Sequence, residues 1–179
     1  MVSRNGLNAK VDIRLQDYRS IDEAGSFDKI ASVGMYEHVG LNDLQAYFDQ
    51  IAKLLRPGGL ILNQGIYLLN GEGRPKGANA DFINRHVFPG GATPTLPAVM
   101  QHRSKAGLEI ADFEDLRPHY ARTVSLWLER LEGREREAIA CVGAERYRNW
   151  RIVLGGMAYA FDGGWLSAGQ IIICLQARK

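Results

Sequence analysis

The chain has 179 residues, 46% of them hydrophobic, which is enough for one domain with a buried core. Its 22 lysines and arginines nearly balance its 20 aspartates and glutamates, so no strong global field indicates a nucleic-acid partner. No apolar run approaches the roughly 20 residues of a membrane span, and no secretory leader is evident, so we expect a cytoplasmic protein whose membrane contact would be peripheral, at the inner face.

Strand and helix signals alternate in the first third of the chain. Three short apolar runs predict strands: Lys10–Leu15, Phe27–Val33 and Leu60–Ile66. The second and third flank five apolar residues whose spacing fits one face of a helix that Gly58-Gly59 then ends: Leu41, Leu44, Phe48, Ile51 and Leu55. A strand–helix–strand unit implies parallel pairing with a right-handed crossover, so the predicted fold class is α/β.

The middle of the chain is rich in glycine, proline and asparagine. Residues 68–95 therefore predict a long loop with one short helix around Asp81–His86. Five elements are expected beyond it, in chain order: a helix at Pro97–Ala106, a strand at Leu108–Leu116, a helix whose apolar face carries Val124, Trp127, Leu128 and Leu131, a long helix at Glu135–Phe161, and a last strand at Gln170–Ala177.

Charged and sulfur-containing residues in the last third leave one choice open. Arginines and glutamates alternate between Arg134 and Arg151, so this segment is either a contact for anionic lipid or a solvated, salt-bridged face.

Cys141 and Cys174 lie far apart, and we expect both to be reduced, buried core residues without a catalytic role. No metal-ligand spacing occurs, so we expect no metal.

Five short motifs, taken in order, resemble one family. They are LQDYR at 15–19, FDKIASVGMYEHVG at 27–40, LRPGG at 55–59, FPGG at 88–91, and PHYART at 118–123 with LW at 126–127. From about Lys10 to its end, the chain resembles the cyclopropane-fatty-acyl-phospholipid synthases. The RPGG turn is common to many methyltransferases, whereas the EHVG and HYA pieces are far more specific.

The resemblance implies a truncated class I, Rossmann-like methyltransferase sheet with an α-helical insertion at the lipid site. The family order is 3-2-1-4-5-7-6, and the predicted strands correspond to the third through the seventh. Residues 1–179 would thus form a partial methyltransferase domain, with 68–95 near the substrate site. The first two strands and the glycine-rich cofactor turn would be missing. Because the Phe27–Val33 strand would lose a neighbour, we expect a fragment or incomplete product, a homo-oligomer, or a chain that needs its missing amino-terminal half.

The activity implied by the resemblance is methyl transfer from S-adenosylmethionine to a cis double bond of a phospholipid acyl chain. Loss of a proton then closes a cyclopropane ring, and a bound bicarbonate is the base in the family. Two alternatives stay open. One is a related methyltransferase acting on another nucleophile, and the other is a non-catalytic fragment that does not bind the cofactor alone.

The resemblance assigns three catalytic positions. Glu37 and Tyr120 match the glutamate and tyrosine that hold bicarbonate in the family, but the family histidine aligns with Gln64. Glutamine cannot carry a proton near neutral pH, which bears on bicarbonate and ring closure more than on methyl transfer. The structural alternatives are that Glu37 caps the following helix and that Tyr120 is a half-buried aromatic residue. Met157 stands where some members have a cysteine, so no thiol chemistry is expected there.

The surviving half of the cofactor site would contain four residues. Gln16 and Asp17 match the position that meets the adenine, while Val33 and Gly34 match the turn under the ribose and methionine parts. Alternatively, Asp17 is a turn residue after a strand and Gly34 is needed only for its backbone freedom. His38 either caps the helix or contacts the cofactor.

Overall fold

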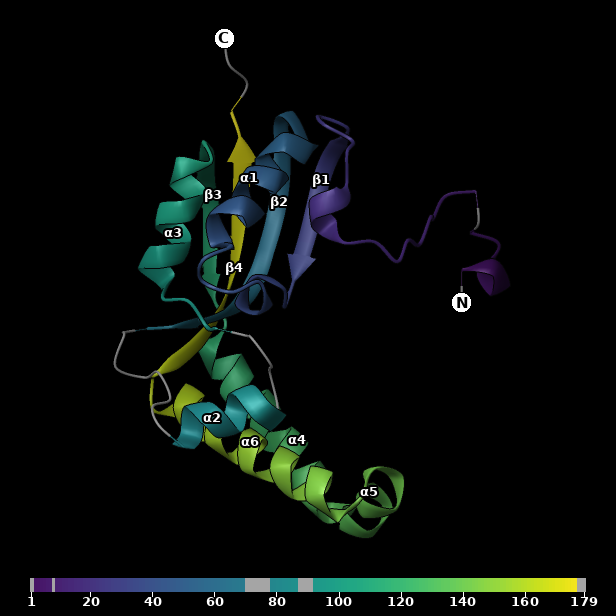
Figure 1. Cartoon of the computed structure of the whole chain (residues 1–179), viewed down its shortest axis with the longest axis vertical. Helices are drawn as coiled ribbons and strands as arrows, with labels where there is room; N and C mark the ends of the chain where they lie inside the picture. The colour runs from purple at the N-terminus through teal and green to yellow at the C-terminus, as the bar shows by residue number, and fades with distance from the viewer. Residues whose placement is uncertain (1, 8, 70–77, 87–91, 177–179) are drawn as a thin grey trace.

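A four-stranded sheet and a projecting set of helices make up the chain (Figure 1). The computed structural model describes residues 2–7, 9–69, 78–86 and 92–176. In spatial order the strands are β1 (Phe27–Val33), β2 (Leu55–Leu68), β4 (Leu166–Leu175) and β3 (Leu108–Asp115). β1 and β2 are parallel, and the other two pairings are antiparallel. This is the 4-5-7-6 part of the expected order, so the α/β fold class is confirmed.

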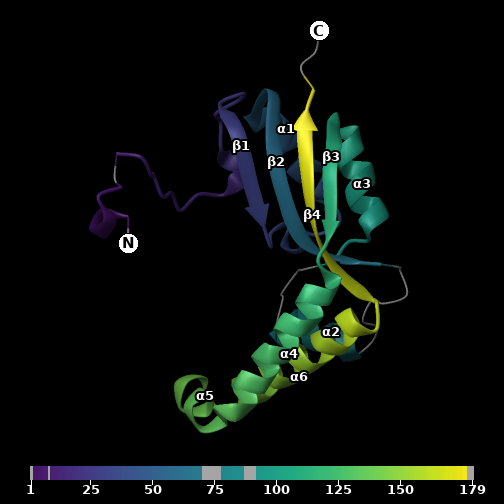
Figure 2. The same cartoon turned by 180° about the vertical axis from the view of Figure 1, so that it is seen from behind.

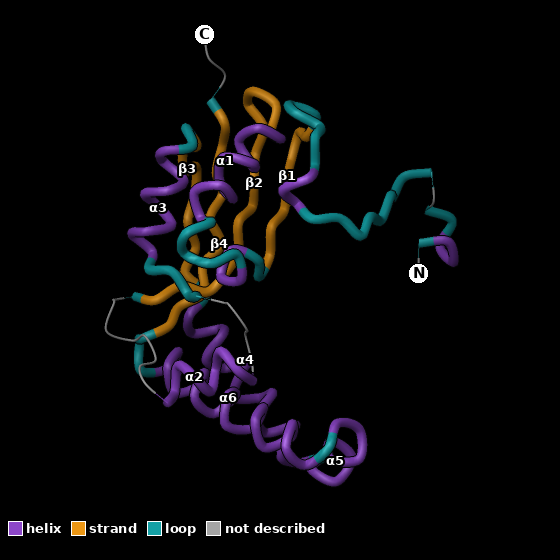
Figure 3. Tube along the Cα trace, viewed as in Figure 1, coloured by secondary structure: helices purple, strands orange, loops and turns teal. Residues whose placement is uncertain are grey.

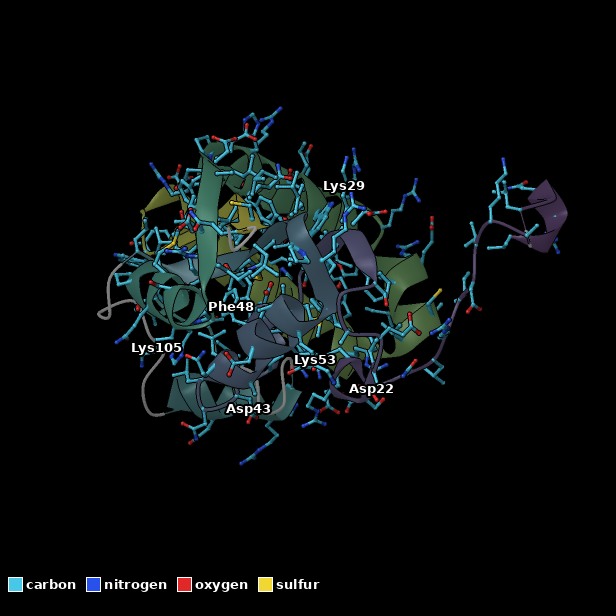
Figure 4. The ribbon with its side chains drawn as sticks, turned by 90° about the horizontal axis from the view of Figure 1, so that it is seen from above. Asp22, Lys29, Asp43, Phe48, Lys53 and Lys105 are labelled. Atoms are coloured by element: carbon cyan, nitrogen blue, oxygen red, sulfur yellow. The ribbon has the colours of Figure 1, made fainter. Side chains whose placement is uncertain are left out.

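One face of the sheet is covered by two helices, α1 (Leu44–Leu54) and α3 (Leu96–Lys105). Phe48 of α1 is fully buried between its helix and the sheet, whereas Lys29 lies on the far side of β1 (Figure 4). The Tyr47 hydroxyl also ties α1 to the sheet, because it hydrogen-bonds Ser32 Oγ of β1 at 2.6 Å and Asn63 Oδ1 of β2 at 2.8 Å. Burial of this face supplies the main core.

The opposite face of the sheet is bare at the end that lies away from the helices in the lower part of Figure 2. Among the described residues no helix covers it there, and Leu60 of β2, next to the core residue Ile61 and therefore on the other face of the strand, is 37% exposed. The outer edge of β1 likewise has no strand partner in the described part of the chain. An open edge and an uncovered apolar face together indicate a surface suited to further contacts.

The lower helices form an arm at the carboxyl ends of β1 and β2 (Figure 1). We call α4 (Arg117–Gly133), α5 (Glu135–Val142) and α6 (Ala144–Asp162) the helical arm; α2 (Ala78–His86) lies beside it. α4 and α6 share a second core with the lower ends of β2 and β4, centred on Val124, Leu154, Phe161 and Ala168.

Two expectations about single elements are wrong. Lys10–Leu15 is not a strand but an exposed loop that runs away from the sheet, with Leu15 fully exposed (Figure 3). In the family order a third strand pairs only with the second, so it has no ladder to join in this chain. The expected helix Glu135–Phe161 is two helices, because Gly143 adopts φ 84°, a value that ends a helix and favours glycine.

Other differences are smaller. The helix α1 begins at Leu44 instead of Leu41, and Leu55 already belongs to β2. The short helix expected at Asp81–His86 is present and begins at Ala78, while the Phe88-Pro89-Gly90-Gly91 motif lies outside the described residues. Cys141 is exposed and Cys174 half-buried, so the expectation of two buried thiols is wrong. Cys141 lies on α5, the helix of the arm that has no buried residue.

Candidate active site

The predicted catalytic residues Glu37, Gln64 and Tyr120 all lie near the place where β1 and β2 end side by side, although only Gln64 and Tyr120 are in direct contact. Because the two strands are parallel, their carboxyl ends share one edge, where ligands of open α/β sheets bind. Gly34, directly after β1, donates its N–H to the Gln64 carbonyl oxygen of β2 at 3.0 Å. The short 3-10 helix η3 (Tyr36–His38) follows and carries Glu37. Its last residue, His38, is exposed.

The side chains of Gln64, on β2 of the sheet, and Tyr120, on α4 of the helical arm, are in direct contact. The Gln64 side chain is buried, and its Nε2 donates a hydrogen bond to Tyr120 Oη at 2.5 Å, although the residues are 56 positions apart. Tyr120 is half-buried on α4 and packs against Phe161 of α6, with ring centroids 5.5 Å apart and ring planes tilted by 48°. The fold therefore joins two of the three predicted catalytic residues directly. Met157, on α6, packs among the apolar residues of the arm.

Glu37 points at β2 and not at the start of α1. Its Oε1 accepts a hydrogen bond from Ile66 N–H at 3.4 Å. Its Oε2 is buried without a hydrogen-bond partner among the described residues. Burial raises the pKa of the Glu37 carboxyl, which the N–H groups offset only in part. The result is a carboxyl group with one unsatisfied oxygen and a strengthened tendency to hold a proton.

Tyr36 belongs to this site, and sequence reasoning missed it. The ring is almost completely buried and lies on Gly65, where an added Cβ would be 2.5 Å from Tyr36 Cε1 and 2.6 Å from Glu37 Oε2. Burial raises the pKa of the Tyr36 phenol, and the nearby Glu37 carboxylate raises it further. Gly65 thus allows two side chains to lie against β2. The sequence signal was the glycine beside Gln64 in the middle of a strand.

Val33 and Gly34 form an open turn beside Glu37. Val33 is 66% exposed, and Gly34 has φ 62°, so its backbone freedom is needed. A Cβ at Gly34 would meet only Glu37 Oε1, at 4.0 Å, which leaves the backbone accessible from that side. Both interpretations of Gly34, backbone geometry and ligand approach, are compatible with this turn.

Gln16 and Asp17 lie in a different, exposed turn. Asp17 caps the 3-10 helix η2 (Tyr18–Ser20) by accepting from Arg19 N–H at 2.9 Å, and it forms an ion pair with the Arg19 guanidinium at 2.6 Å. These bonds from Arg19 lower the pKa of Asp17 to about 2. Gln16 Nε2 donates to Ser20 O within the same turn. The turn interpretation of Asp17 therefore describes its contacts, and its role toward adenine remains a prediction.

A second polar cluster holds the start of α4. Asp115 accepts hydrogen bonds from Tyr67 Oη at 2.8 Å, from Ser167 Oγ at 2.9 Å and from Arg117 N–H at 2.8 Å. The cluster connects β2, β3 and β4 to the first turn of α4, three residues before Tyr120. Sequence reasoning missed it, although an acidic residue just before a helix is a common N-terminal signal.

Replacing Asp115 by asparagine is expected to lower the free energy of unfolding by about 1 kcal/mol. The expected loss is small for three hydrogen bonds because Asp115 is exposed and solvent weakens their effect. Burial alone would raise the pKa of Asp115, but the Arg117 N–H and the two hydroxyls outweigh it and lower the pKa. A lowered pKa stabilises the fold above the ordinary aspartate range, and this stabilisation disappears as the pH falls through the lowered value. Urea unfolding should therefore show a smaller difference at acid pH, and the exposed Asp112→Asn is the matched control.

No group of three potential metal ligands from His, Cys, Asp and Glu occurs in the part of the chain that the structure describes.

The sheet order, the crossover α1 and the acidic residue at the end of β1 define the class of the protein: the second half of a class I methyltransferase sheet. The model of the mycolic acid cyclopropane synthetase family matches residues 1–171, and the chain belongs to this family.

Among curated proteins, "Probable fatty acid methyltransferase" of Pseudomonas putida is 44% identical over 172 residues, covering 96% of this chain and 44% of the relative. The solved cyclopropane synthase MmaA2 of Mycobacterium tuberculosis superimposes with a TM-score of 0.83 at 29% identity, covering 97% of this chain and 65% of that one. The mycolic acid cyclopropane synthase CmaA1, in complex with SAH and CTAB, gives 0.82 at 28% identity, covering 96% and 65%. The chain thus spans less than half of the Pseudomonas relative.

Proposed function

We propose that the site transfers the methyl group of S-adenosylmethionine to a cis double bond of a phospholipid acyl chain, and that a proton then leaves to close a cyclopropane ring. The observation that supports this most is the convergence of Glu37, Gln64 and Tyr120 at the carboxyl ends of two parallel strands. An alkene is a weak nucleophile, so the protein has to align it, exclude water and accept a proton.

The cofactor side fits S-adenosylmethionine in part. The open backbone at Val33–Gly34 lies beside Glu37, as a close-approaching ligand requires, and CmaA1 was solved with SAH. Asp17, by contrast, is engaged with Arg19, so the adenine side would need Asp17 to exchange that partner. When bound, the cofactor supplies an electrophilic methyl group. In this proposal Val33 and Gly34 hold its middle part, and Gln16 and Asp17 its adenine.

Glu37 is the proposed proton acceptor or the ligand of a proton acceptor. Its unpartnered Oε2 would accept the hydrogen of a bound bicarbonate, and Tyr120 Oη would donate to the anion. Gln64 fits bicarbonate less well, because its amide already donates to Tyr120 and cannot take up a proton. Without bicarbonate, the raised pKa of Glu37 suits it to accept the proton itself.

Gln64 favours a second candidate, in which the same methyl transfer ends without ring closure, or a different nucleophile is methylated. The name of the Pseudomonas relative, a fatty acid methyltransferase, is compatible with this outcome. The two products differ in whether an olefin survives. Both acyl chains gain about 14 mass units, but only the cyclopropane resists mild hydrogenation, so mass spectrometry after that step distinguishes them.

The test of the proposed function uses labelled S-adenosylmethionine and vesicles of cis-unsaturated phospholipid. The chain is assayed alone and co-expressed with the amino-terminal part of the Pseudomonas relative that lies outside the match. We expect labelled lipid in the co-expressed sample and none with that amino-terminal part alone. Absence of label in every sample, together with no cofactor binding by calorimetry, would favour the non-catalytic alternative.

Gln64→His is expected to raise the cyclopropane share of the methylated lipid while total label stays within about threefold, because histidine can accept and pass on a proton at neutral pH. The exposed Gln101→His on α3 is the matched control. An unchanged product ratio in the Gln64→His chain would contradict a role for this position in ring closure.

No helix in the described part of the chain is long and apolar enough to cross a membrane. We propose a cytoplasmic protein that meets its phospholipid at the membrane surface. The open edge of β1 and the bare sheet face are the proposed contact for an amino-terminal half or for a second copy of the chain.

A further inference from the structure

A groove lies between the three helices of the arm. These helices project away from the sheet (Figures 1 and 3). Its volume is about 540 Å³, and Trp127 and Leu131 of α4 face Trp150 and Leu154 of α6 across it. Arg130 and Arg134 also line it, and Glu137 of α5 is the acidic residue among the lining. We call this the arm groove.

The apolar part of the arm groove is unusually accessible. The exposed fraction is 52% for Trp127 and 41% for Trp150, and the nearby Val142 at the end of α5 is 47% exposed. Trp165, at the other end of the arm, is similarly exposed but stacks edge-on against Tyr159 at 5.0 Å. Two exposed indoles in one groove indicate a contact surface, because exposed aromatic clusters usually mark one.

The charges beside the groove indicate the kind of surface that it meets. Within the described residues Arg130 and Arg134 form no ion pair, whereas Arg151, farther along α6, pairs with Glu132 at 2.6 Å. Two unpaired guanidinium groups and two indoles in one groove suit the interface of an anionic bilayer. Tryptophan favours the headgroup level, and arginine binds phosphate.

We propose that the arm groove docks the protein on an anionic phospholipid bilayer, with Trp127 and Trp150 entering the interface and Arg130 and Arg134 contacting lipid phosphates. This inference deepens the proposed function and rests on it for its purpose, since a lipid substrate has to be reached. Trp127 and Tyr120 are seven residues apart on α4, about two turns and 10 Å along one face. Docking would therefore bring the bilayer to the side of the arm that leads to Gln64 and Tyr120.

The test is flotation of the full chain with phosphatidylcholine vesicles, with and without phosphatidylglycerol. We expect stronger binding to the anionic vesicles and a roughly tenfold weaker partition for both W127A/W150A and R130Q/R134Q. Two variants are matched controls and should bind like the unaltered chain: W165A, and K29Q/K105Q, whose lysines lie on the sheet part (Figure 4). Equal loss in the controls, or equal binding to both vesicle types, would overturn the proposal.

A second measurement does not depend on the folding of the double variants. The chain W165F keeps Trp127 and Trp150 as its tryptophans, and brominated acyl chains in anionic vesicles should quench their fluorescence. Absence of quenching would overturn the proposal. A changed oligomeric state of W127A/W150A with unchanged flotation would also overturn it, because that result would assign the groove to contact with a second copy of the chain. Neither experiment uses S-adenosylmethionine, so vesicle binding by the chain, together with no labelled lipid in the co-expressed sample, would contradict the proposed function and leave the docking surface standing.

Discussion

Gly65→Ala is expected to lower the free energy of unfolding by about 2–4 kcal/mol, because the added methyl group would overlap a packed site. Its Cβ would lie 2.5 and 2.7 Å from two ring atoms of Tyr36 and 2.6 Å from Glu37 Oε2. Tyr36 is buried in the core with α1, so its ring has little room to move. Urea unfolding followed by circular dichroism measures the loss.

Gly156→Ala is the matched control for that substitution. Gly156 lies in α6, has nothing within 4 Å of an added Cβ, and has an ordinary helical backbone. Alanine there should stabilise the chain by about 0.5–1 kcal/mol, because it restricts the unfolded state and favours a helix. If Gly65→Ala left stability unchanged, the close contact of Tyr36 and Glu37 with β2 would be wrong.

Glu37→Gln is expected to separate activity from stability. In the methyl-transfer assay with labelled S-adenosylmethionine and the amino-terminal part supplied, the rate should fall by about 10²–10⁴, the usual contribution of a positioned acid or base. At the same time the free energy of unfolding near pH 8, measured by urea unfolding, should rise by about 1 kcal/mol. The reason is that the substitution removes a buried charge that lacks a full set of hydrogen-bond partners.

The pH dependence of this gain follows from the raised pKa of Glu37. A carboxyl with a raised folded-state pKa favours the fold most below the ordinary glutamate range, and this contribution is lost as the pH rises through the raised value. The advantage of Glu37→Gln should therefore shrink toward pH 4. The exposed Glu109→Gln is the control for both measurements. A variant with full activity would contradict the proposed role of Glu37.

Much of the fold could be predicted from local signals. The period of the apolar residues located α1, and the run after Gly59 located the central part of β2. The sequence did not reveal that Lys10–Leu15 would stay unpaired, because a strand exists only with a partner and the partner is a property of the whole sheet. It also did not reveal the break at Gly143, since glycine inside a helical pattern is often tolerated.

The candidate site was predictable where a motif carried it. Glu37, Gln64 and Tyr120 came from the family resemblance, and the structure brings them into one neighbourhood. Tyr36 and Asp115 escaped, because their importance lies in contacts with residues far along the chain: Gly65 for the first, and Tyr67 and Ser167 for the second. Such contacts depend on strand register, which a single sequence does not specify.

The ladder between β2 and β4 runs without interruption from Leu60 to Leu68, opposite Cys174 to Leu166. Its upper part carries Ile61 and Ile171 of the sheet core, and its lower part carries Ile66 and Ala168 of the arm core. The two cores therefore share one set of backbone hydrogen bonds, with Gln64 in the middle. Thermal opening of the arm should loosen the amides around Gln64 as well, so the proposed catalytic site is expected to lie inside a single cooperative unit of hydrogen exchange.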